Sequence, residues 1–287
     1  MEQIIPAAAR SQILRRHTAG MNSPSIGELA EARVARYLRE RGYAFEVEPE
    51  FGTGRHPDYL ITAGEHTIVA EVKAFETYGM FTNAVPGQVM TRSLEDALTP
   101  IRSKIKDAAG QLRGLQNRGW PLVVVLDNPG GRPIPFDSHM ILSAMYGDLA
   151  LEASLEPGGT LGEFRAVAGR NGRLRNDHAY VSAVAVVRRE DHAALWAARW
   201  FDEHREDFGP GDADDGGQGV KTMIAAFAEA SKEAPEGDEI FLEVFETLSN
   251  SATPLPRNVF NGPRDLRWVP NEDRTALVPL SDGARTG

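Results

Sequence analysis

The sequence predicts an α/β protein in which helices flank a mixed sheet, followed by an α+β elaboration toward the C-terminus. Residues 23–127 read in order as a helix, three strands, a second helix and a fourth strand. The segments in this part of the chain are long enough for the hydrophobic period of a helix to be distinguished from that of a strand. Apolar residues make up 41% of the 287-residue chain, which is enough for a substantial core.

The first helix is predicted by the segment "SPSIGELAEARVARYLRERGYAF". Ser23 or Ser25 can cap it, and Glu28 follows Ser25 at the spacing of a capping box. Gly42 suits the position just after the helix. Apolar residues recur at helical intervals at Ile26, Leu29, Ala30, Val34 and Leu38.

Three strands follow the first helix. The segment "YAFEVEPEF" alternates between apolar and polar residues, Pro57 precedes the short strand "DYLITA", and "TIVAEVKAF" has the β-branched composition of a central strand. The intervening "AGEH" reads as a turn. The second and third strands are therefore expected to form an antiparallel hairpin.

The second helix and fourth strand are predicted by "LEDALTPIRSKIKDAAGQLRGLQNRGW" and "PLVVVLD". Residues 128–145 read as irregular, and residues 146–189 as two or three further strands, of which "VSAVAVV" is interior. A helix at "DHAALWAARWFDEHRED" precedes the acidic linker "GPGDADDGGQG". The helical stripe predicted for the second helix is Ile101, Ile105, Ala108, Leu112 and Leu115.

We therefore expect four regions along the chain. Residues 1–22 form an N-terminal arm, and residues 23–188 form the core with its extra strands. Residues 189–270 form a helical, acidic extension, and residues 271–287 form a flexible tail. The net charge of −10 comes from the acidic residues of the last third, which argues against a protein that coats nucleic acid indiscriminately.

Several classes of protein are excluded by composition. The chain has no cysteine, so disulfides, thiolate metal sites and a cysteine nucleophile are excluded, and we expect a cytoplasmic protein. No run of 18 apolar residues is present, so no membrane span is expected. A phosphate-binding loop of the nucleotide triphosphatases is also missing from the sequence.

Charged residues in the predicted hairpin are the main functional signal. Strand alternation places Glu71 and Lys73 on one face of the third strand. Asp58, at the start of the paired strand, can converge with them. Two carboxylates brought together lose hydration and favour a cation, Mg²⁺ first and Mn²⁺ second. Such a site can hydrolyse a phosphodiester, whereas on an exposed hairpin the same residues would form a solvated cross-strand ion pair.

These residues resemble the motif of the PD-(D/E)XK nuclease superfamily, which has the restriction-endonuclease-like fold. The matching residues are Pro57-Asp58 and Glu71-Val72-Lys73, and the order of elements over about residues 23–127 also matches. The first helix of that superfamily often carries a Gly-x-x-x-Glu pattern, which here runs from Gly27 to Glu31. Many members have a glutamine on the second helix, where this chain has Gln111, with Lys104 on the same helical face.

The resemblance implies a metal-dependent endonuclease that leaves a 5′-phosphate and a 3′-hydroxyl. Asp58 and Glu71 would bind Mg²⁺, and Glu31 would bind it through water or hold a second ion. Lys73 would orient the attacking water, and Gln111 and Lys104 would contact the substrate or support the site. DNA is favoured over RNA by family frequency, in restriction, anti-phage defence or repair. A homodimer or a protein complex fits cleavage of two strands by one site per chain.

Basic residues outside this motif are further candidates for contact with nucleic acid. His56 precedes the Pro-Asp pair and could contact a phosphate, or it could be an ordinary turn residue. Arg170, Arg173 and Arg175 lie in "GRNGRLRN", which could grip a nucleic-acid backbone or form a solvated basic hairpin tip.

Two alternatives to a nuclease stay open at the level of sequence. The first is a nucleic-acid-binding or scaffolding protein that keeps the nuclease fold without cleaving. The presence of Asp58, Glu71 and Lys73 together argues against it, because an inactive site has no reason to keep all three. The second is a small-molecule enzyme or a structural α/β domain with a coincidental ion pair.

Overall fold

The computed structural model describes residues 23–76, 91–154, 162, 165–204, 224, 228 and 231–280, apart from residues 53, 55, 133, 175 and 176. The predicted arm at 1–22 and the acidic linker lie outside the described residues. No helix within the described ranges is long and apolar enough to cross a membrane. The described elements are α2 (Ile26–Glu40), β1 (Ala44–Val47), β2 (Tyr59–Ala63), β3 (His66–Ala74), α3 (Leu94–Leu112), η1 (Arg113–Leu115), β4 (Leu122–Asp127), α4 (Ser138–Tyr146), β5 (Gly147–Glu152), β6 (Arg165–Asn171), β7 (Ala183–Asp191), α5 (His192–Glu203), η3 (Ser231–Glu233), β8 (Asp238–Glu246), β9 (Leu266–Pro270) and β10 (Leu277–Pro279).

One mixed sheet of eight strands forms the centre of the molecule, in the order β1-β2-β3-β4-β7-β8-β9-β10. The first three strands form an antiparallel meander, whereas β3, β4 and β7 run parallel to one another. The β7–β8 pair is antiparallel, and β5 and β6 form a separate two-stranded sheet. The predicted α/β class, the mixed sheet and the order helix, three strands, helix, strand are confirmed.

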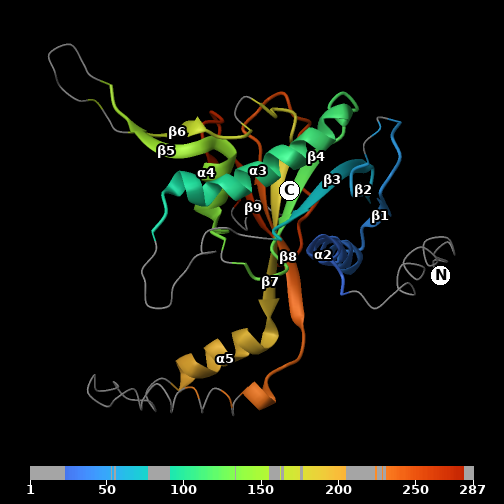
Figure 1. The fold of residues 1–287 in the computed structure, drawn as a ribbon, viewed down its shortest axis with the longest axis vertical. Coiled ribbons are helices and arrows are strands. Elements are labelled where there is room, and N and C mark those ends of the chain that lie inside the picture. Colours follow the sequence, from blue (N-terminus) through green and yellow to red (C-terminus); the bar gives the residue numbers. More distant parts are fainter. Residues whose placement is uncertain are drawn as a thin grey trace.

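Helices α2 and α3 cover opposite faces of the sheet (Figure 1). On β3, Val72 belongs to a buried cluster that includes Ala30 of α2. Val69, which points to the other face of β3, belongs to a second cluster that includes Ile105 of α3. The alternation of β3 therefore divides its side chains between two cores.

Both predicted helices form where the sequence places their caps and stripes. Ser25 caps α2 through Glu28 in a reciprocal capping box, with the Glu28 amide donating to Ser25 Oγ at 3.2 Å. Ser93 caps α3. The stripe predicted for the second helix is buried throughout, although the α-helix itself ends at Leu112 and continues as η1.

The structure departs from the predicted organisation in two places. Residues 128–145, predicted to be irregular, contain most of α4, whose first turn is capped by Asp137 accepting from the Met140 amide at 3.1 Å. The expected boundary at 188/189 falls inside β7, and β8, β9 and β10 complete the same sheet. β10 also lies within the range predicted as a tail. These strands join the sheet through apolar side chains such as Leu242 and Val244, which are buried against the core.

Strands β7 and β8 continue beyond their neighbours as a long two-stranded ribbon, with α5 at its far end (Figure 1). The predicted helix after the interior strand is confirmed as α5, which begins immediately at the end of β7. The ribbon thus separates α5 from the hairpin that carries the predicted catalytic residues.

Candidate active site

The β2–β3 hairpin sets the position of Asp58 beside Glu71. The strands pair antiparallel with Tyr59 opposite Ala70, so the next position along the ladder places Asp58 next to Glu71. The turn between the strands requires a positive φ of 61° at Gly64, a conformation that favours glycine. The Asp58 side chain is fixed by the Val72 amide, which donates to Asp58 Oδ2 at 2.6 Å.

Glu71 is a buried carboxylate in the middle of β3, with only 1% of its surface exposed. Lys73 Nζ donates to Glu71 Oε1 at 2.6 Å, so the two alternate residues of the strand meet on one face as predicted. Glu71 Oε2 is buried and finds no hydrogen-bond partner among the described residues. One carboxylate oxygen of this site therefore has no described partner to offset the cost of its burial.

The two carboxylates raise each other's energy in the charged form. Burial, followed by the negative charge of Asp58, raises the pKa of Glu71 to about 7, against the opposing effects of the Lys73 ammonium and the Asp58 backbone amide. Burial likewise raises the pKa of Asp58, while the Val72 amide and the Lys73 charge lower it. Two acids and one base leave a site that a bound cation would stabilise.

Glu31 approaches this region from α2, the helix on the opposite face of the sheet from α3. The Tyr59 hydroxyl donates to the Glu31 main-chain carbonyl at 2.8 Å. Burial raises the pKa of Tyr59, and the negative charges of Glu31 and Asp58 raise it further. Both carboxylates therefore lie close enough to the phenol to act on it, with Glu31 on the α2 side.

Asp58 and Glu71 are the carboxylates at this position that could hold a metal. Across the described residues there is no group of three or more His, Cys, Asp or Glu side chains that could hold a metal ion. Glu31 does not form such a group with Asp58 and Glu71, and its helix α2 covers the face of the sheet opposite to Glu71, so its predicted contact would have to pass through water. Mg²⁺ commonly binds to one or two carboxylates and keeps several waters for itself and the substrate. Asp58 and Glu71, whose Oε2 has no described partner, fit this pattern.

Lys104 and Gln111 are half-buried residues on α3, which packs on β3 and β4. They lie seven residues apart and share one flank of the helix. The other flank contacts α4 and the segment before β7, through Arg102 to the Ser143 carbonyl and through Tyr180 to the Ala109 carbonyl. The Lys104 flank therefore faces the β2–β3 side, although no hydrogen bond or ion pair in the described part of the chain joins it to Asp58, Glu71 or Lys73.

The remaining residues predicted to contact nucleic acid are His56, Arg170, Arg173 and Arg175. His56 is exposed, directly before the buried Pro57. Arg173 is half-buried after β6, close enough for its charge to act on His178. Arg170 belongs to β6, with its side chain outside the described part, and Arg175 lies outside the described residues.

A second buried carboxylate was missed at the level of sequence. Asp127, 1% exposed, ends β4, and its Oδ1 accepts from Arg33 Nη1 of α2 at 3.3 Å. Burial raises the pKa of Asp127 to about 6, although the Arg33 charge lowers it. The available signal was an acid at the end of an apolar strand, but its partner lies 94 residues away in sequence.

Comparisons with protein-family models, with curated proteins and with solved structures found no match.

Proposed function

We propose that the protein is a Mg²⁺-dependent nuclease that hydrolyses phosphodiester bonds of nucleic acid, with DNA as the favoured substrate. The observation that carries the proposal is the meeting of Asp58, Glu71 and Lys73 on one face of the β2–β3 hairpin, with a buried Glu71 oxygen that lacks a partner among the described residues.

A purely structural role explains this arrangement poorly. A buried acid beside a single base can compensate its charge, but a second acid at the same place adds repulsion and a further desolvation penalty. The pKa of Glu71, raised to about 7 by burial and by Asp58, reflects that unfavourable environment. Groups with perturbed pKa values of this origin are concentrated at functional sites.

Each residue has a defined part in the proposed reaction. Asp58 and Glu71 would hold the cation, which would polarise the phosphoryl group and lower the pKa of a bound water. The Val72 amide fixes Asp58 in place, so the ligand needs little reorganisation. Lys73 would orient the attacking water and stabilise negative charge that develops on the phosphoryl oxygens. Glu31 would support the site from α2 through water.

The proposal is tested by incubating the protein with plasmid, linear duplex, single-stranded DNA and RNA, in the presence of Mg²⁺, Mn²⁺ or EDTA. We expect metal-dependent cleavage of at least one substrate, and loss of cleavage in Asp58→Asn and Lys73→Met. Arg199→Met, a charge removal on the remote α5, serves as the matched control for Lys73→Met and should cleave like the wild type.

Two results would favour the alternatives. Binding of nucleic acid that is unaffected by the substitutions, with no cleavage under any condition, would support a binding or scaffolding protein. Neither binding nor cleavage would support a small-molecule enzyme or a structural domain with a coincidental ion pair.

A further inference from the structure

An open pocket of about 320 Å³ lies on the outer side of α3, away from the Lys104 flank. It is lined by Lys106, Asp107, Gly110 and Arg113 of α3 and by His178 of the segment before β7. We call it the α3 pocket. Lys106 and Arg113 lie seven residues apart and therefore share one flank of the helix.

The basic side chains of the α3 pocket have no acidic partner. Neither Lys106 nor Arg113 forms an ion pair or side-chain hydrogen bond with any residue that the structure describes. Arg173 does not line the pocket, but it lies close enough for its charge to act on His178. The Nε atom of Arg173 is buried without a hydrogen-bond partner in the described part of the chain. A buried donor of this kind is rare unless a ligand or water completes it.

His178 is held in a defined tautomer at the wall of the pocket. The Tyr180 hydroxyl donates its hydrogen to the Ala109 carbonyl at 2.8 Å, and it lies 3.2 Å from His178 Nδ1. Because the hydroxyl hydrogen is already used, Nδ1 carries the proton that forms this second bond. His178 Nε2 is therefore the nitrogen that gains a proton when the imidazole becomes charged.

The electrostatics of the pocket disfavour that charge while no anion is present. Burial lowers the pKa of His178, and the charges of Arg113, Arg173 and Lys106 lower it further, against the opposing effect of Asp177. Asp107 also lines the pocket. Two cations, Lys106 and Arg113, and one acid, Asp107, therefore line the pocket around an imidazole whose protonation a bound anion would favour.

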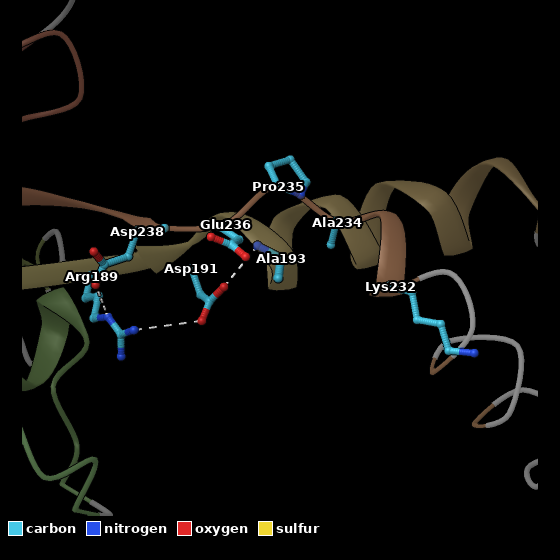
Figure 2. A pocket seen from close by; sticks show the side chains of 9 residues that line it. Arg189, Asp191, Ala193, Lys232, Ala234, Pro235, Glu236 and Asp238 are labelled. Atoms are coloured by element: carbon cyan, nitrogen blue, oxygen red, sulfur yellow. Dashed lines mark hydrogen bonds and ion pairs between the residues drawn. The ribbon is translucent and has the colours of Figure 1, made fainter.

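A second pocket of about 400 Å³ near the junction of β7 and α5 shows the contrasting case. Figure 2 shows Arg189 directed toward Asp191 and Asp238, with which it forms ion pairs, the first at 3.8 Å. That basic residue is already neutralised by its neighbours. Unpaired cations distinguish the α3 pocket from it.

We propose that the α3 pocket binds a phosphate group. A tetrahedral anion with several oxygens can accept from an arginine fork, a lysine ammonium and a protonated imidazole together. The pocket is separate from Asp58, Glu71 and Lys73, so the proposal holds whether or not the chain cleaves nucleic acid. The phosphate could belong to a nucleic-acid backbone or to a free phosphate monoester.

The test follows the His178 imidazole by proton NMR during a pH titration, in chloride and in inorganic phosphate at equal ionic strength. Its resonance is assigned by its loss in His178→Gln. We expect phosphate to raise the pKa of His178 by about one unit. This rise should disappear in Lys106→Ala/Arg113→Ala and persist in Arg39→Ala/Arg199→Ala, which removes the same charge elsewhere. Both pairs are exposed, so the fold should survive.

The source of the phosphate is distinguished by repeating the titration with adenosine monophosphate and with a duplex that lacks terminal phosphates. The duplex is used with Asp58→Asn to prevent cleavage. A rise with the duplex identifies a backbone phosphate, and a rise with only inorganic phosphate and the nucleotide identifies a monoester. The proposal is overturned if none of the three raises the pKa, or if the Lys106→Ala/Arg113→Ala protein responds like the wild type.

Discussion

Glu71 and Asp127 are buried carboxylates on the neighbouring strands β3 and β4, one on each face of the sheet. Each is 1% exposed, accepts from one basic side chain and has a second oxygen without a hydrogen-bond partner among the described residues. Burial raises the pKa of both, to about 7 and about 6. The two carboxylates differ in their neighbouring charges, because Asp58 adds a second negative charge beside Glu71.

The comparison shows why a buried ion pair is weak evidence for function. Asp127 and Arg33 form a single acid–base pair, and Arg33 also donates to the Pro129 carbonyl at 3.2 Å. Such a pair joins α2 to the loop after β4 and can serve structure alone. At Glu71 the charges do not balance, and the excess acid is what a cation would offset.

The largest expected difference between the two carboxylates is in catalysis. Glu71→Gln should reduce the rate of metal-dependent cleavage by about a thousandfold, since it removes a proposed metal ligand. Asp127→Asn should stay within about threefold of the wild type, because Asp127 is paired with Arg33 and is not a proposed metal ligand. Rates are compared at saturating Mg²⁺ after circular dichroism has shown that both variants are folded. Equal losses in the two variants would remove the distinction drawn here.

The next effect is on stability, and Asp127 shows it over a lower pH range than Glu71, whose pKa is raised to about 7. The Asp127 carboxyl has an ordinary pKa of 3.8 and a folded pKa of about 6, so the folded state binds the proton more tightly between these values. The free energy of unfolding therefore falls as pH rises from about 4 to about 6, by about 2 to 3 kcal/mol from this group. Asp127→Asn should remove this part of the pH dependence.

Urea unfolding of wild type and Asp127→Asn at a series of pH values measures the difference directly. If the free energies of unfolding of wild type and Asp127→Asn differ by the same amount at pH 4 and pH 6, Asp127 titrates normally. The Arg33 pair would then be more solvated than the structure indicates.

A smaller loss is expected at Glu31, which lies on the α2 side of the sheet with Arg33. Groups that act on a metal site through water typically contribute about tenfold to a hundredfold. Glu31→Gln should therefore lower the cleavage rate by about tenfold, well short of the effect at Glu71. The neighbouring Glu28→Gln affects only the capping box and is the matched control. A loss as large as that of Glu71→Gln would mean that Glu31 binds the metal directly.

The local part of this architecture could be predicted from the sequence because its determinants are close together. The capping box of Ser25 and Glu28, the turn at Gly64 and the alternation through Glu71 and Lys73 each depend on a few consecutive residues. Strand alternation and a tight turn are enough to bring Asp58 and Glu71 side by side.

The remaining features depend on contacts between distant segments. Asp127 meets Arg33 only because the Arg33 side chain of α2 reaches the end of β4, and His178 reaches Ala109 through Tyr180, 71 residues away. The addition of β8, β9 and β10 to the sheet likewise requires pairing that no local pattern specifies. Lys106 and Arg113 share a helical flank that periodicity could have indicated. The opposite wall of the pocket is formed by His178, which comes from the segment before β7.

The most direct test of the account is a Mn²⁺ titration followed by electron paramagnetic resonance, which counts bound ions without requiring cleavage. We predict that wild type and Asp127→Asn bind Mn²⁺ alike, and that Asp58→Asn and Glu71→Gln lose this binding by at least about tenfold in affinity. Unchanged Mn²⁺ binding by Asp58→Asn and Glu71→Gln would contradict the claim that these two carboxylates share a divalent cation.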